Sequence, residues 1–180
     1  MCCDLRLWGG HDLRGHPDRL AATMTEILLG TNDGAQTWSI TGLYLVGTKF
    51  TAVASGNMTV FKIVGSASGN VKVGLYTDNA GSPNVLLNSV GSTAITAGLN
   101  SIDFPSTAII SGKVYWLVAN SDTNNIIGGT NGVGTGFYMS LAWASAFPNP
   151  LTGTTPYSAT VLLAGYGTAS VSFIPRPIFF

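Results

Sequence analysis

Short runs of β-branched and aromatic residues, separated by glycine, asparagine, serine and proline, recur along the chain from Glu26 onward. Such runs favour strands because these side chains pack well on a pleated surface, while the residues between them accept turn conformations. The pattern is typical of a sandwich or barrel, and no segment reads as a helix. The runs expected to form strands are Trp38–Val46, Lys49–Ala54, Asn57–Val64, Val71–Tyr76, Val85–Val90, Ser101–Phe104, Val114–Ala119, Phe137–Trp143, Ser158–Leu163 and Ser170–Ile174.

Alternation within these runs indicates that one face of each strand is buried. In the run that starts at residue 71, Val71, Val73 and Leu75 share one face, and Ile102 and Phe104 share another on either side of a polar residue. The sequence therefore predicts an all-β fold, an antiparallel, jelly-roll-like β-sandwich of about ten strands.

The distribution of charge divides the chain into unequal parts. At 180 residues the length fits one domain. Residues 1–24 contain both histidines and six of the sixteen charged residues, without the apolar core of a secretory signal. We expect an N-terminal leader or arm over 1–24, the sandwich over 25–174 and an apolar C-terminal tail over 175–180.

The scarcity of charge and the shortness of the apolar runs argue against two further classes of function. Charged residues make up 9% of the chain and the net charge is zero, against a typical charged share of about 25%. A nucleic-acid partner is not expected, because phosphate binding needs a basic stripe or patch. A membrane span is not expected either, because no run approaches the roughly 18 to 20 apolar residues that a spanning helix needs.

About 65 residues carry a resemblance to a known module. They contain GLYTDNAGSPNVLL, then the pair Ile102 and Phe104, then SGKVYWLVA. This pattern resembles a jelly-roll-like sandwich found in extracellular and phage-associated proteins, similar to carbohydrate-binding domains and to domains that precede cell-surface anchors. The resemblance implies binding of a glycan or cell-surface polysaccharide, or a role in display or attachment. We expect an extracellular or surface-exposed location, on a virion or a cell.

Aromatic residues near irregular segments are the candidates for sugar binding, because aromatic faces stack on pyranose rings while amides and hydroxyls bind the sugar hydroxyls. Two such segments stand out, Asn120–Gly136 and Phe147–Tyr157, of which the first is predicted to be the longest loop. Trp38 and Trp116 lie within predicted strands, where core packing is favoured. The candidate ligand-binding residues are Trp143, Phe147, Tyr157, Tyr138, Asn125 and Asn131.

Acidic residues are few, and no histidine follows His16, so the sequence does not predict an enzyme. No cofactor is expected, with a structural calcium ion as the alternative. The residues that suggest calcium are Asp78, Asn79 and Asp122, whose oxygens suit a hard cation if the two carboxylates meet at one end of the sandwich. Their other interpretation is as turn-forming side chains. A zinc set is imaginable only from residues of the leader, namely Cys2, Cys3, His11 and His16.

The closing stretch SVSFIPRPIFF is apolar, and Pro175 and Pro177 prevent it from continuing as a central strand. It either folds back over the sandwich or inserts into a neighbouring copy as a donated strand or arm. Two functions therefore remain open. The first is a non-catalytic carbohydrate-binding or adhesion module, and the second is a structural subunit of a viral, phage or extracellular filament assembly that associates through its terminal arms.

Overall fold

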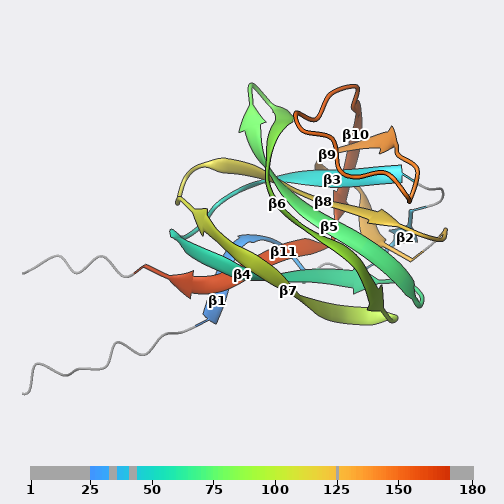
Figure 1. Ribbon diagram of the computed structural model, residues 1–180, viewed down its shortest axis with the longest axis horizontal. Coiled ribbons are helices and arrows are strands. Elements are labelled where there is room, and N and C mark those ends of the chain that lie inside the picture. Colours follow the sequence, from blue (N-terminus) through green and yellow to red (C-terminus); the bar gives the residue numbers. More distant parts are fainter. Residues whose placement is uncertain (1–24, 33–35, 41–43, 125, 171–180) are drawn as a thin grey trace, which may run out of the picture.

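Two antiparallel β-sheets pack face to face to form the domain (Figure 1). The computed structural model describes residues 25–32, 36–40, 44–124 and 126–170. All regular elements in these ranges are strands, which confirms the predicted all-β sandwich. In chain order they are β1 (Thr25–Gly30), β2 (Trp38–Ser39), β3 (Tyr44–Thr51), β4 (Gly56–Gly65), β5 (Gly69–Asn79), β6 (Ser82–Ile95), β7 (Gly98–Ile109), β8 (Val114–Ser121), β9 (Gly128–Ser140), β10 (Thr155–Val161) and β11 (Leu163–Ala169).

The two sheets differ in width. The small sheet has the order β1-β11-β4-β7, and the large sheet has the order β10-β9-β3-β8-β5-β6, with the short β2 paired to β9 outside this path. The edges are therefore β1 and β7 in the small sheet and β6 and β10 in the large one. The chain passes between the sheets six times, and the last of these crossings is at Leu162, between β10 and β11.

The main core lies between the sheets. Val71, Val73 and Leu75 on β5 are fully buried, as their alternation predicts, and they belong to the same apolar cluster as Ile102 and Phe104 on β7. Each such side chain stabilises the fold by roughly 1.5–3 kcal/mol relative to an exposed position. This core fixes which face of each strand points inward.

A second apolar cluster covers the opposite, outer face of the large sheet. Its fully or nearly fully buried members include Tyr76, Trp116 and Phe137 from three strands and Leu151 from the segment between β9 and β10. Strand β8 is consequently buried on both faces, which explains the apolar run Val114–Ala119. We call the segment 141–154 the covering loop, because it supplies apolar side chains to this outer cluster.

Two glycines make room for aromatic rings in the outer cluster. A Cβ on Gly47 would lie 2.6 Å from a ring carbon of Phe137, and a Cβ on Gly74 would lie 2.8 Å from a ring carbon of Phe147. Real Cβ atoms do not approach other atoms so closely. The absent side chains at these two strand positions therefore allow the rings to lie directly on the sheet.

The prediction that Asn120–Gly136 is one long loop is wrong over its second half, because β9 begins at Gly128. The glycines of this second half are needed for the geometry of the large sheet. A Cβ on Gly136 would lie 2.8 Å from a backbone oxygen of β10 and 3.0 Å from one of β3, and Gly132 and Gly134 adopt φ values of 76° and 85° where the β9–β10 register shifts. Close backbone approach and a bulge both require glycine in this strand, and its composition therefore resembles that of a loop.

The stretch between the predicted strands Val85–Val90 and Ser101–Phe104 is also largely strand. β6 continues to Ile95 and β7 begins at Gly98, so only a tight turn remains. The Asn100 side chain closes this turn by donating hydrogen bonds of 2.8 and 2.9 Å to the carbonyls of Thr96 and Gly98.

Several strand boundaries differ from those predicted. β1 was not predicted, β3 continues to Thr51 through a predicted break, and β9 ends at Ser140 before Trp143. The predicted strand Ser158–Leu163 is divided at Leu162, where the chain moves between sheets. Residues 33–35, 41–43, 125 and 171–180 lie outside the described part of the chain, as does the leader over 1–24 with its cysteines and histidines. Among the described residues no helix is suited to crossing a membrane.

Candidate functional site

The aromatic candidates fall on opposite faces of the large sheet. Tyr138 pairs with Val46, a member of the core between the sheets, and residues opposite each other in a pair point to the same side. Phe147 instead packs against the outer cluster, and Trp143 lies beside it in the covering loop. The structure therefore does not bring the four predicted aromatic residues into one groove.

Tyr138 and Tyr157 do meet, and Tyr44 joins them. The ring centroids of Tyr138 and Tyr157 are 6.2 Å apart at an interplanar angle of 89°, and those of Tyr44 and Tyr138 are 5.5 Å apart at 74°. Tyr138 is 38% exposed, whereas the other two rings are half-buried. Partial burial raises the pKa of the Tyr157 phenol, so this hydroxyl stays protonated as a hydrogen-bond donor. We call these three residues the tyrosine cluster.

Trp143 and Phe147 have a different neighbour, the ammonium group of Lys72. This group lies 4.7 Å from the centroid of the Trp143 ring and 5.8 Å from that of Phe147. It also donates hydrogen bonds to the backbone carbonyls of Trp143 and Ser145, the latter at 2.7 Å. Partial burial lowers the pKa of Lys72. These two aromatic side chains thus hold the covering loop to β5, and both are only half exposed.

Further hydrogen bonds attach the covering loop along the large sheet. The Tyr76 hydroxyl donates to the Pro148 carbonyl at 2.7 Å, and burial raises the pKa of this phenol strongly. The Leu86 N–H donates to Asn149 Oδ1 at 3.1 Å, and the Leu151 N–H donates to the Asn84 carbonyl at 2.8 Å. The loop is therefore bound at both its beginning and its middle.

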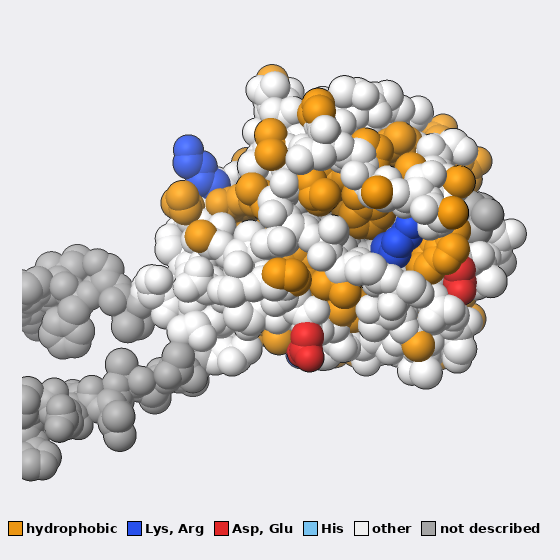
Figure 2. Space-filling model, in the orientation of Figure 1, with side chains coloured by type: hydrophobic (Ala, Val, Ile, Leu, Met, Phe, Trp, Pro, Cys, Tyr) orange, Lys and Arg blue, Asp and Glu red, His pale blue; other side chains and the backbone are white. Residues whose placement is uncertain are grey.

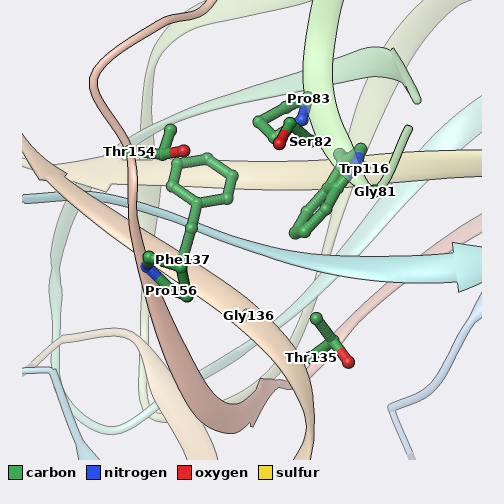
Figure 3. Close-up of a pocket in the computed structure, with 9 residues that line it drawn as sticks. All are labelled: Gly81, Ser82, Pro83, Trp116, Thr135, Gly136, Phe137, Thr154 and Pro156. Carbon is green, nitrogen blue, oxygen red and sulfur yellow. The ribbon is translucent and has the colours of Figure 1, made fainter. Parts of the chain in front are cut away.

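A shallow pocket opens beyond the end of the covering loop, between the β5–β6 hairpin and β10 (Figure 3). Its floor is apolar, with the Trp116 and Phe137 rings at a centroid distance of 5.4 Å and an angle of 62°, beside Pro83. Its hydroxyl groups come from three residues, Ser82, Thr135 and Thr154. The pocket volume of about 50 Å³ is far below the roughly 300–1,000 Å³ of a site that encloses a small molecule.

Asp78 fixes two parts of this pocket. One carboxylate oxygen accepts a 2.8 Å hydrogen bond from Trp116 Nε1, and the other accepts a 3.0 Å hydrogen bond from the Gly81 N–H. The indole in the floor and the hairpin in the wall are therefore held by one side chain. The sequence prediction that Trp116 is a core residue is confirmed, since it is 2% exposed.

The proposed calcium ligands are not brought together. Asp78 lies at the end of β5, whereas Asp122 lies beside Asn70 at its start and accepts 2.9 and 2.7 Å hydrogen bonds from the Asn70 backbone and side chain. Eight residues of strand separate these ends by about 26 Å. Hydrogen bonds from the Asn70 side chain and backbone lower the pKa of Asp122. Asn79 lies at the exposed hairpin, next to Asp78.

The remaining polar candidates add little to the tyrosine cluster or to the pocket. Asn131 is exposed on β9, and its backbone N–H donates to Thr37 Oγ1 at 3.1 Å, while Asn125 lies outside the described residues. Within the described ranges no three side chains of His, Cys, Asp and Glu gather where they could hold a metal ion.

Sequence reasoning missed Lys72 and the pocket over Trp116. The available signal for the first was a lysine within the stretch Val71–Tyr76, which carries no other charged residue. On the face shown in Figure 2, charged side chains are few, and hydrophobic side chains gather mainly over the large sheet.

No protein-family model matches the chain, and no curated protein matches its sequence.

Proposed function

We propose that this protein is a non-catalytic carbohydrate-binding or adhesion module that acts in an extracellular or surface-exposed setting. The tyrosine cluster is the observation that carries the proposal. Tyr138 is the most exposed aromatic side chain among those whose burial is described, and its contacts with Tyr44 and Tyr157 hold it in place.

Sugars bind well to such a surface because their C–H groups stack on aromatic rings without requiring charge. The contacts between the three rings hold them in one arrangement, which lowers the ordering cost of binding. Hydroxyl and amide groups dominate the polar surface, since only 9% of the residues are charged. A neutral polysaccharide suits this chemistry better than a polyanion.

The test is a glycan array probed with the full chain and with the double variant Tyr138→Ala, Tyr157→Ala. We expect the native chain to bind at least one neutral glycan and the variant to bind it about tenfold or more weakly, which corresponds to loss of roughly 1.4 kcal/mol of stacking. Tyr166→Ala is the matched control, because this half-buried tyrosine lies on the small sheet and packs against Lys62. Binding that survives the double change would refute the site.

A structural subunit of a viral, phage or extracellular filament is the second candidate, favoured by a different observation. Val53 and Ile110 are 68% and 55% exposed, and the segments that carry them are joined by a hydrogen bond from Ser111 Oγ to the Val53 carbonyl. Thr25 and Ser170, the first and last residues of the described sandwich, lie at the same end, since the Ser170 N–H donates to the Ser55 carbonyl and Thr25 pairs with Thr168. Exposed apolar groups there suit contacts between copies.

Light scattering at several concentrations distinguishes the two candidates. A subunit should form oligomers that the double variant Val53→Asp, Ile110→Asp disperses, and that deletion of 1–24 and 171–180 also disperses. A concentration-independent monomer would leave the binding module as the function.

A further inference from the structure

The size of the pocket over Trp116 restricts its ligand to a small group. Its volume is about 50 Å³, roughly a third of a cavity that holds benzene. A pyranose ring does not fit. The pocket has room for a methyl group and part of a carbonyl, so its ligand must be a substituent that projects from a larger molecule bound outside.

The chemistry of the lining restricts the group further. None of the nine lining residues is charged, and near the Trp116 ring the Lys49 ammonium at 5.8 Å is opposed by the hydrogen-bonded Asp78 carboxylate. The floor is apolar, whereas the hydroxyls of Ser82, Thr135 and Thr154 both donate and accept. The ligand group should therefore be neutral, apolar at its tip and amide-like or carbonyl-like at its base.

We propose that this pocket receives the acetamido group of an N-acetylated sugar, an inference that rests on the proposed glycan-binding function. The methyl of this group lies against Trp116 and Phe137, and its amide N–H and carbonyl reach the hydroxyls at the rim. A hydroxymethyl substituent would instead place a hydroxyl on the apolar floor, at the cost of an unmade hydrogen bond.

The pocket adjoins the tyrosine cluster across one edge of the sandwich. Pro156 lines the pocket, and the next residue of edge strand β10 is Tyr157. An oligosaccharide that crosses this edge can contact both surfaces. The hydrogen bonds from Trp116 and Gly81 to Asp78 keep the floor and wall in place before the ligand arrives.

The experiment uses arrayed oligosaccharide pairs that differ only by the acetamido group, such as glucose and N-acetylglucosamine or galactose and N-acetylgalactosamine polymers. We expect the full chain to bind the N-acetylated member about tenfold more tightly, from burial of one methyl group and an amide hydrogen bond. Thr135→Phe places a ring at the exposed mouth of the pocket. The affinities for the N-acetylated and the unacetylated member should then become equal. Thr152→Phe, an exposed change in the covering loop that does not line the pocket, should keep the preference.

The outcomes separate this inference from the proposed function. If the native chain binds glycans without preferring N-acetylated members, or if Thr135→Phe keeps the preference, the pocket is not the acetamido site while the glycan-binding function stands. If the native chain binds no glycan at all, both proposals are refuted.

Discussion

Replacement of Lys72 by methionine should release the beginning of the covering loop while keeping the apolar stem of the side chain. The change removes the hydrogen bonds from the ammonium to the carbonyls of Trp143 and Ser145. It also removes the contact of the charge with the Trp143 and Phe147 rings, at 4.7 and 5.8 Å.

The magnitude follows from these contacts. Two hydrogen bonds from a charged donor would contribute about 1.5–3 kcal/mol each if fully buried. Lys72 is only partly buried, so water screens its charge, and the lowered pKa shows that desolvation already opposes the ammonium. We therefore expect a net loss of about 1–2 kcal/mol in the free energy of unfolding, or roughly 3–6 °C in Tm for a domain of this size.

Urea unfolding measures the loss, and hydrogen exchange followed by mass spectrometry locates it. Exchange should increase in 141–154 and remain unchanged in β4 and β11. Lys62→Met is the matched control, because the Lys62 ammonium lies 4.3 Å from the Tyr166 ring centroid, and the contact described for it is with this ring alone. The control should lose only about 0.5–1 kcal/mol.

Equal losses for the two variants, or unchanged exchange in 141–154 after the Lys72 change, would show that the carbonyl hydrogen bonds do not hold the loop.

Two other predictions concern the outer cluster. Phe137→Ala should lower the free energy of unfolding in urea by about 3–5 kcal/mol. Gly47→Ala should cost less stability in the Phe137→Ala background than in the native chain, because a Cβ at position 47 would lie 2.6 Å from the Phe137 ring. Equal costs in the two backgrounds would contradict the placement of this ring. Because the pKa of Tyr76 is raised, its contribution to stability is full below its unfolded pKa of about 10 and falls as the pH rises above it. Tyr76→Phe should flatten the decline of the urea midpoint above about pH 10, and an unchanged decline would contradict this assignment.

Alternation in the sequence predicted the fold class and several inward residues correctly, because a strand with one buried face carries that information locally. Ile102 and Phe104 are 3% and 5% exposed, as predicted, and Asp103 between them is exposed. Trp116 was likewise placed in the core correctly. These features depend on neighbours two residues away, which a sequence displays directly.

The faces occupied by the aromatic candidates could not be predicted in the same way. Tyr138 and Phe147 lie on opposite sides of one sheet, and this depends on the β3–β9 register and on the course of the covering loop. Lys72 contacts residues 71 and 73 positions away in the chain. One clue was present, since the continuous apolar run of β8 indicates a strand covered on both faces.

The edges of the two sheets carry a feature that limits strand addition in a chain with so little charge. Many sheets protect an exposed edge with lysines, whose repulsion weakens in salt. Here three of the four edge strands carry a proline instead, Pro83 on β6, Pro105 on β7 and Pro156 on β10. A proline has no N–H to donate to an added strand. Because the missing donor is covalent, this obstacle to strand addition does not depend on ionic strength or pH.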